Sequence, residues 1–415
     1  MSELRRVVVT GVGMICPVGL DVETSWKNLL AGKSGIGTIQ GFDASKFGVR
    51  IAGEVKGFDP AQYMDYKTAR RSGRFAQMGV GAAKQALCSA KLEITQANRD
   101  QIGVVLASSG NPFEMGEQER IIRERGAQKV DPLLIPRLGQ YMAGVRVGRV
   151  IGVRGPNTTV NSACASGTDA IGHAWNLIRT GQTEVLIAGA TETIVSPVGV
   201  AAMAQLGALT KEGNDDPERA SRPFDKTRAG FVLSEGAGIL ILEAEEYALA
   251  RGAHVLCELA GCGWSFDAAD DTAPDADGQS LAMIRALKSA GLRPQDVSYI
   301  NAHGTSTQLN DRAETAAIKK ALGEDVARKV PISSIKSMIG HLGAGAGGVE
   351  AVVSALTIRD NILPPTINYK VPDPECDLDY VPNEARPHQV DVLLSNSFGL
   401  GGQNASLVLR RYRGA

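Results

Sequence analysis

The sequence contains few cysteines, few aromatic residues and almost no net charge. Only 6 of the 415 residues are Cys and none forms a CxxC pair, which argues against a disulfide framework or a zinc site and favours a reducing compartment. Lys plus Arg total 44 and Asp plus Glu total 45, so a nucleic-acid binder that relies on an overall basic field is excluded. No apolar run reaches the roughly 18 residues of a membrane span. We expect a soluble cytoplasmic protein with no metal, nucleic-acid or membrane partner.

Glycine, in contrast, is abundant. The chain has 48 Gly, and they show no three-residue period, which excludes a collagen-like helix. A hydrophobic content of 43% is too high for a disordered chain. The length allows a large core and suggests two domains or one large duplicated one.

Short apolar runs rich in β-branched residues alternate with helical patterns along the whole chain. This alternation predicts an α/β protein whose mixed sheet is covered on both faces. The second half repeats the first in outline, so we expect an internal duplication with halves 1–252 and 253–415; two unrelated α/β domains are the alternative. The predicted strands are Arg5–Thr10, Ile102–Ala107, Glu184–Ala188, Gly238–Leu242, Val255–Leu259, Val297–Ala302 and Asp391–Leu394, and a helix is predicted over Glu243–Arg251.

One cysteine lies in a setting typical of a nucleophile. The segment NSACASGTDAIGHAWNLI places Cys164 between a predicted strand over Thr158–Asn161 and a helix with apolar residues at helical spacing from Ile171 to Ile178. Small residues around Cys164 permit a sharp bend that resembles the nucleophile elbow of hydrolases. The positive end of the helix is expected to favour the thiolate, and free N–H groups in the turn can stabilise an oxyanion. The alternative is an ordinary buried cysteine.

Two of the 5 histidines lie in matching loops. His303 belongs to NAHGTST, directly after a predicted strand, and His341 belongs to KSMIGHLGAGAGGVE, directly before a predicted helix. Two neutral imidazoles can each donate a hydrogen bond to one thioester oxygen and so stabilise an enolate. This combination indicates carbon–carbon bond formation by decarboxylation, with Cys164 holding the second acyl group. A cysteine hydrolase or a simple acyltransferase remains the alternative from the residues alone.

The motifs together resemble a known family. VNSACASG, RPFD, GFVLSEGAG, INAHGTST, KSMIGHLGAGAG and NSFGLGGQN occur in this order, and the chain from VVVTGVGM to NASLVL is similar to the elongating beta-ketoacyl-[acyl-carrier-protein] synthases, closest to type II. The resemblance implies a thiolase-like fold, with two similar mixed-sheet halves in five α-β-α-β-α layers, and a homodimer. It also implies an acyltransferase that condenses malonyl-carrier protein with a Cys164-bound acyl group, elongating the chain by two carbons in fatty acid biosynthesis.

The resemblance also implies roles for individual catalytic residues. Cys164 would take the acyl chain from the phosphopantetheine of acyl carrier protein, and His303 and His341 would act on the malonyl thioester. Lys336 would support the second histidine. The N–H groups of Cys164 and Leu400 would form the oxyanion hole, and the gating loop would comprise Phe398, Gly399 and Leu400.

Further residues are implied to contact the substrates or the carrier protein, and no cofactor is expected beyond the carrier-bound substrates. The implied pantetheine contacts are Thr272, Thr305 and Thr307, and the implied carrier-docking residues are Lys67, Arg70 and Arg71, which share one face of a predicted helix. Asn301, Glu350, Ser395 and Asn396 correspond to a buried polar cluster that holds a monovalent cation in some family members.

Several positions depart from the common type II pattern. Leu400 and Gln403 stand where the gating loop usually has Phe and Thr, Asp270 stands where a histidine is common, and RAG at 228–230 replaces RDG. Leucine is smaller than phenylalanine and has no flat face, so we expect a looser gate and a wider acyl pocket. Chain length and pathway stay open.

Four other functions are alternatives to this one. The subunit of a type II polyketide ketosynthase shares the fold and the catalytic residues. A non-catalytic chain-length partner is disfavoured because Cys164 and both histidines are retained. A thiolase uses a second catalytic cysteine, and it is disfavoured because the candidate, Cys376, lies in an irregular segment. A dinucleotide-binding oxidoreductase is weakly suggested by Gly11 and Gly13, but the third glycine of that fingerprint is replaced by Cys16.

Overall fold

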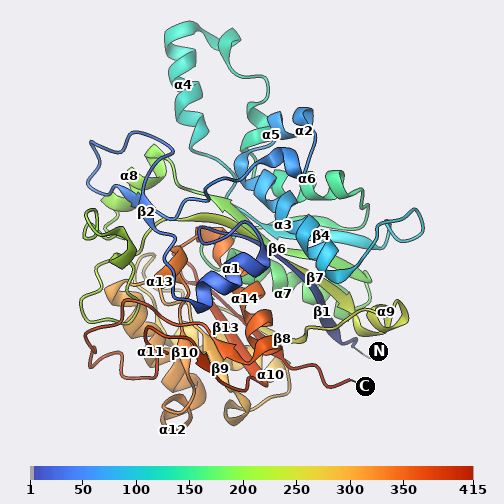
Figure 1. Ribbon diagram of the computed structural model, residues 1–415, viewed down its shortest axis with the longest axis vertical. Coiled ribbons are helices and arrows are strands. Elements are labelled where there is room, and N and C mark those ends of the chain that lie inside the picture. The colour runs from blue at the N-terminus through green and yellow to red at the C-terminus, as the bar shows by residue number, and fades with distance from the viewer. Residues whose placement is uncertain (1–3, 415) are drawn as a thin grey trace.

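A single hydrogen-bonded sheet of ten strands runs through the computed structural model (Figure 1), which describes residues 4–414. The strand order is β10-β9-β13-β14-β8-β1-β7-β6-β4-β5. The strands are β1 (Val7–Ile15), β4 (Ile102–Ala107), β5 (Asn157–Val160), β6 (Val185–Thr193), β7 (Glu235–Ala244), β8 (Cys257–Phe266), β9 (Tyr299–Asn301), β10 (Ile332–Ser333), β13 (Val392–Phe398) and β14 (Gln403–Arg410).

The two halves of the sheet have the same topology. The first half reads β5-β4-β6-β7-β1 and the second reads β10-β9-β13-β14-β8, so each half places its third, second, fourth, fifth and first strand in that order. The two halves of the sheet join where β1 pairs with β8, at Val8 with Glu258 and Val9 with Cys257. A repeated strand order is the arrangement expected of a duplicated chain. The boundary at residue 252 stays a prediction.

Helices lie between the two halves and on both outer faces. Helices α7 (Ser166–Arg179) and α14 (Ala346–Asp360) contact strands of both halves and therefore lie between them. Helices α3 (Arg74–Ala90) and α6 (Met142–Ile151) cover the outer face of the first half, and α10 (Ala276–Ser289), with α11 (Gln308–Leu322) beside it, covers the second. The result is the five-layer α-β-α-β-α arrangement expected from the sequence.

Glycines let the first turns of the two central helices touch. A Cβ on Gly347 would lie 2.4 Å from the main-chain nitrogen of Thr168, and a Cβ on Gly167 would lie 2.7 Å from that of Gly348. Neither backbone can yield, so only glycine allows this approach. The contact brings the start of α7, and with it Cys164, beside the loop that carries His341.

Several predicted elements differ in extent from the observed ones. Strand β1 continues to Ile15 through Gly11 and Gly13, where a Cβ would lie 2.2 Å and 1.9 Å from main-chain oxygens of α3. These glycines mark close helix packing and not the end of a strand. The helix predicted over Glu243–Arg251 starts only at Glu245, because β7 runs through Ala244 before α9 (Glu245–Ala250) begins.

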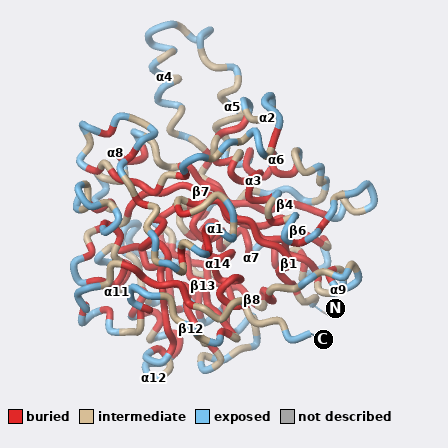
Figure 2. Tube along the Cα trace, viewed as in Figure 1, coloured by how far each residue is buried: buried red, intermediate tan, exposed pale blue. Residues whose placement is uncertain are grey.

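Helix α4 (Glu114–Arg125) projects away from the body of the molecule and has no buried residue (Figures 1 and 2). Within residues 4–414, no helix is both long enough and apolar enough to cross a membrane. The remaining helices are α1 (Val22–Leu30), α2 (Tyr66–Arg70), α5 (Leu134–Leu138), α8 (Pro197–Gln205), α12 (Glu324–Ala327) and α13 (Lys336–Ile339), and two small sheets pair β2 (Gly37–Thr38) with β3 (Ile51–Ala52) and β11 (Ile362–Leu363) with β12 (Arg386–Pro387).

Candidate active site

Cys164 lies in a tight turn between β5 and α7. Ala163 adopts a left-handed conformation with φ +51°, which costs energy in a non-glycine residue and is common at functional sites. The Ser166 hydroxyl holds the turn, since it accepts the Ser162 N–H at 2.8 Å and donates to the Ala163 carbonyl at 2.5 Å. The turn therefore has the elbow geometry expected from the sequence.

The electrostatics of the thiol differ from the expectation. Burial raises the pKa of Cys164 above its ordinary value, while the Leu400 N–H and the Lys336 charge act to lower it. The net direction is upward, so the pKa gives no support for the resting thiolate expected from the sequence. A neighbouring base must take the thiol proton before the sulfur can attack.

The gating loop after β13 packs directly on the cysteine turn. A Cβ on Gly399 would lie 2.7 Å from the Ser162 carbonyl oxygen, so a glycine is required there. The Leu400 N–H lies near enough to the Cys164 sulfur to act on its pKa. Among residues 4–414, neither this N–H nor that of Cys164 has an oxygen acceptor. Two free N–H groups therefore lie at the reactive sulfur.

The two histidine rings lie next to each other. The ring centroids of His303 and His341 are 5.4 Å apart and the rings are inclined at 85°. Both Nδ1 atoms are buried without a partner among the described residues. Burial, followed by the charge of Lys336, holds the pKa of each ring well below 6.5. Both imidazoles are therefore neutral, as the enolate-stabilising role requires.

Lys336 supports the first histidine more directly than the second. Its Nζ donates to the main-chain carbonyl of His303 at 2.7 Å and forms a buried ion pair with Glu350. The main chain of His341 is held instead by the Val232 carbonyl at 2.7 Å and the Ser234 N–H at 3.0 Å. We expected Lys336 to support His341. In the structure its hydrogen bond holds the loop of His303 instead.

Two acidic residues of α11 were missed by the sequence reasoning. Glu314 accepts the N–H groups of His303 at 2.8 Å and Gly304 at 2.7 Å, and burial raises its pKa to about 7. Asp311 accepts the N–H groups of Ser306 and Phe224. The available signal was their spacing, since positions 311, 314, 318 and 321 form the buried face of α11.

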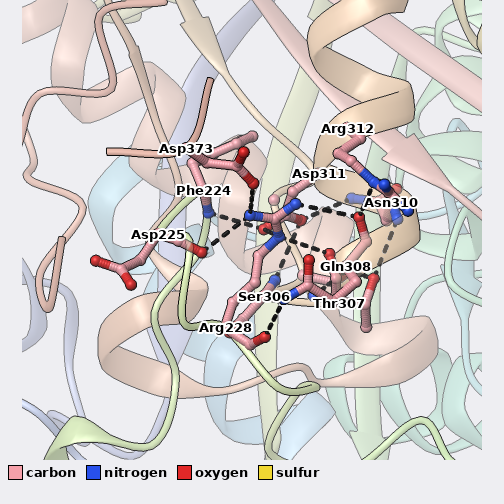
Figure 3. Close-up of polar contacts among 12 residues, drawn as sticks. Phe224, Asp225, Arg228, Ser306, Thr307, Gln308, Asn310, Asp311, Arg312 and Asp373 are labelled. Atoms are coloured by element: carbon pink, nitrogen blue, oxygen red, sulfur yellow. Dashed lines mark hydrogen bonds and ion pairs between the residues drawn. The ribbon is translucent and has the colours of Figure 1, made fainter. Parts of the chain in front are cut away.

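A buried arginine fixes the other side of the same loop (Figure 3). Arg228 donates to Asp373 at 2.6 Å and to the carbonyl of Thr307 at 3.0 Å, and its guanidinium lies 3.5 Å from Asp311. Its side chain has no exposed area. Arg228 belongs to the RAG segment, whose alanine departs from the family pattern, and the alanine leaves this network intact.

Most of the predicted site residues line one cavity of about 400 Å³. The three threonines expected to contact pantetheine line it, but their hydroxyl groups already have partners. Thr272 donates to Asp270 at 2.7 Å, and Thr305 and Thr307 share a hydrogen bond of 2.9 Å. The predicted residues in its lining are Cys164, Thr272, Thr305, Thr307, His303, His341, Phe398, Gly399 and Leu400. Lys336 is 1% exposed and does not line the cavity.

The predicted docking residues lie outside the cavity. Lys67 and Arg70 belong to the short helix α2 and Arg71 follows it, and all three are exposed. No group of three or more His, Cys, Asp or Glu side chains in the described part of the chain is placed to hold a metal ion. Of the polar cluster, Asn301 donates to Ser395 at 3.1 Å, whereas the buried Asn301 Oδ1 has no partner.

Comparisons with known proteins identify the family of this chain. The family model described as Beta-ketoacyl synthase, N-terminal domain, matches residues 4–248, and Beta-ketoacyl synthase, C-terminal domain, matches residues 256–370. The chain belongs to the beta-ketoacyl synthase family. It is therefore an acyltransferase-class enzyme, and the resemblance predicted from the motifs is confirmed.

Relatives of known name cover the full length. A 3-oxoacyl-[acyl-carrier-protein] synthase 2 of Synechocystis is 47% identical over 99% of each chain. The crystal structure of a beta-ketoacyl synthase from Burkholderia phymatum has 34% identity and a TM-score of 0.92, covering 99% of this chain and 100% of the other. The predicted thiolase-like fold is confirmed. A chain from a type II polyketide synthase acyl-carrier protein in complex with its ketosynthase bound to the hexaketide has 34% identity, the same coverage and a TM-score of 0.89.

Proposed function

We propose that the protein is a 3-oxoacyl-[acyl-carrier-protein] synthase that elongates a carrier-bound acyl chain by two carbons in fatty acid biosynthesis. One observation carries the proposal: a free cysteine, two neutral imidazoles and two unpartnered main-chain N–H groups border one cavity. Curated relatives of that name are 43–47% identical over nearly the whole chain. The division near residue 252 that we propose for the two halves falls between the two family matches.

The first half-reaction loads the enzyme. A neutral imidazole of the histidine pair takes the Cys164 proton, and the sulfur attacks the thioester carbonyl of the acyl-carrier protein. The N–H groups of Cys164 and Leu400 hold the oxyanion of the tetrahedral intermediate. The carbon–sulfur bond to the pantetheine then breaks, and the departing thiolate takes the proton from the imidazole.

The second half-reaction forms the carbon–carbon bond. A malonyl thioester loses carbon dioxide, and the electron pair of the broken bond forms an enolate whose oxygen accepts hydrogen bonds from His303 and His341. The enolate carbon attacks the acyl carbonyl on Cys164, and the carbon–sulfur bond breaks to release a 3-oxoacyl chain on the carrier. The released Cys164 thiolate then takes a proton from solvent, which restores the thiol. Because one product leaves before the second substrate binds, the kinetics are ping-pong. This chemistry uses only residues of the chain and carrier-bound substrates.

Acyl carrier protein is the partner that this chemistry requires. The exposed Lys67, Arg70 and Arg71 form a small basic surface on a chain of net charge −1, which suits an acidic carrier protein. We also propose a homodimer. The projecting α4–α5 region exposes Met115, Ile122 and Ile135 (56%, 45% and 64% exposed), and β5 is an edge strand. An open strand edge can pair with another chain, and grouped exposed apolar side chains mark interaction sites.

Two smaller expectations remain proposals. The orphaned Asn301 Oδ1, with the hydroxyl of Ser395 near it, is a suitable oxygen ligand for a monovalent cation, whereas the Glu350 carboxylate is already paired with Lys336. We also propose a cytoplasmic location, since the six cysteines are all free, as is usual in a reducing compartment.

One assay tests the proposed reaction. The enzyme is incubated with malonyl-carrier protein and a series of acyl-carrier proteins, and products are identified by mass. We expect 3-oxoacyl-carrier proteins two carbons longer than each accepted primer, and an acyl group on Cys164 in the absence of malonyl substrate. C164A should give neither. A stable acyl-enzyme in C164A, or free acid as the sole product, would contradict the proposal.

A ketosynthase subunit of a type II polyketide-like pathway is the second candidate. The similarity to the ketosynthase complex with 34% identity supports it, although the relatives named 3-oxoacyl-[acyl-carrier-protein] synthase 2 are more similar in sequence. Co-purification with a related partner that lacks the catalytic cysteine would favour this candidate.

A further inference from the structure

A buried glutamine without hydrogen-bond partners lines the catalytic cavity. Gln279 lies in the second turn of α10, is 0% exposed, and borders the same cavity as Cys164 and His303. Neither its Nε2 nor its Oε1 has a hydrogen-bond partner among the described residues. No motif of the sequence pointed to this residue.

An unpartnered carboxamide at this position is costly for the folded protein. The side chains one and two turns further along the same face, Met283 and Ala286, are apolar and pack into the core. A buried polar group without a hydrogen bond keeps the full penalty of its desolvation, so an apolar side chain would fill the position at lower cost. The amide of Gln279 therefore serves a ligand that enters the cavity.

The position of Gln279 indicates which part of the ligand it meets. Residues at the cavity mouth are exposed, for example Leu309 at 53% and Thr272. Gln279 is fully covered, as the catalytic histidines nearly are. A partner of Gln279 would therefore lie in the enclosed part of the cavity, which a substrate enters with its thioester end, and not at the mouth, where the outer phosphate end of the pantetheine arm would lie.

The two free atoms of Gln279 define the chemistry of the partner. Oε1 needs a donor and Nε2 needs an acceptor, and a secondary amide supplies both. The pantetheine arm contains two secondary amides. The threonine hydroxyls expected to bind it are partly occupied, since Thr272 donates to Asp270 and one of Thr305 and Thr307 donates to the other.

We infer that Gln279 is a substrate-binding residue that exchanges a pair of hydrogen bonds with a pantetheine amide. This inference rests on the proposed function. A hydroxyl group on the acyl chain also offers a donor and an acceptor, but only some substrates carry one, whereas every carrier-bound substrate carries the amides. The amide assignment thus predicts an effect on all acyl groups alike.

The test compares Q279M and Q279L with the native enzyme on paired substrates. One substrate is an acyl thioester of N-acetylcysteamine, which retains the amide nearest the sulfur, and the other is the same acyl group on propanethiol, which has no amide. The rate constant for Cys164 acylation is read by mass, and thermal unfolding is measured without substrate. Combining the enzyme and substrate changes isolates the interaction between them.

We expect kcat/KM for the amide substrate to fall about tenfold in both variants, the factor that corresponds to 1.4 kcal/mol, through KM and with little change in kcat. The amide-free substrate should react equally with all three enzymes. The variants should unfold at the same temperature as the native enzyme or higher, because two unsatisfied buried atoms are removed.

Three outcomes would overturn the inference. An equal loss for both substrates, together with lower thermal stability, would make Gln279 a purely structural residue. A loss confined to 3-hydroxyacyl substrates would move the contact to the acyl chain. Unchanged rates for both substrates would exclude any substrate contact. Absence of acylation in the native enzyme would instead refute the proposed function, so the two failures are distinguishable.

Discussion

The ring of His303 stands nearly perpendicular to that of His341, at 85° and with 5.4 Å between centroids. Each Nδ1 is buried without a partner among the described residues. An imidazolium in this position would place a second positive charge near Lys336, whose ammonium already donates to the His303 carbonyl. The geometry thus favours two neutral rings that can share one substrate oxygen.

The first prediction concerns pH. Burial lowers the pKa of both histidines well below 6.5, so the rings should stay neutral as the pH falls through that value. We expect carbon dioxide release from malonyl-carrier protein to be undiminished at pH 6.5 and to decline only at lower pH. A rate that halves near pH 6.5 would contradict the neutral pair.

The same pKa shifts predict how stability changes with pH. Below pH 6.5 the unfolded chain binds protons at these histidines that the folded chain does not, so the free energy of unfolding decreases from pH 6.5 downward until the folded pKa is reached. Urea titrations of the native enzyme and of an H303N/H341N variant should show that the variant loses less stability over this range.

The second prediction separates the two half-reactions. In H341A, one donor to the enolate oxygen is lost, whereas Cys164 and its two N–H groups are unchanged. We expect acylation of Cys164 to persist and decarboxylation of malonyl-carrier protein to fall by about 10²- to 10³-fold, the usual effect of removing one oxyanion donor. Undiminished carbon dioxide release would exclude this role for His341.

The third prediction tests the buried ion pair. Lys336 and Glu350 are each 1% exposed on their side chains, and K336M would leave the carboxyl group buried without its cation. We expect a loss of about 3–5 kcal/mol in the free energy of unfolding. The K336M/E350L double variant, in which both charges are replaced, should recover much of it. Equal destabilisation of the single and double variants would show that the pairing itself does not matter.

Some of the site followed from the sequence and some did not, for identifiable physical reasons. Cys164, His303 and His341 lie in loops whose residue types carry their chemistry, and the structure places all three on one cavity. Glu314 accepts main-chain N–H groups of the loop that precedes its own helix, and its helical spacing indicated burial but not this contact. Helix polarity alone suggested a thiolate at Cys164, but the degree of burial, which reverses the shift, is a tertiary property.

The fold, like the site, was predicted from the sequence only in part. The alternation of apolar runs predicted the sheet and its helical layers, but the predicted first strand ended at Thr10, before Gly11 and Gly13. They lie inside β1, where α3 packs too closely for any side chain. No sequence pattern indicated Gln279, because the feature that sets it apart is the lack of hydrogen-bond partners for its buried amide among the described residues.

The fourth prediction concerns carrier docking. Charge reversal at Lys67, Arg70 and Arg71 should raise the apparent KM for carrier-bound substrates severalfold. The kcat should stay unchanged, because charges at the rim of an interface mainly affect association. The effect should shrink at high salt. K329E is the matched control for R70E, since Lys329 is exposed beside α12, at the opposite end of the molecule from α2 (Figure 1). An unchanged KM in the triple variant would argue against docking at this surface.

The fifth prediction addresses the gate. Leu400 is 47% exposed and lines the cavity, while its loop is held by the Gly399 N–H to the Gln403 carbonyl at 2.6 Å and the Gly401 N–H to the Asp271 carbonyl at 2.8 Å. A change of side chain at position 400 should therefore alter the gate without displacing the N–H that serves Cys164. We expect the native enzyme to accept long and branched acyl groups, and L400F to lose turnover on those groups while keeping it on short ones. The measurement is a turnover series over acyl length for both enzymes, with C164A as the blank. A native series that stops at short chains would contradict the widened pocket, and an L400F enzyme with an unchanged profile would show that the leucine does not set it.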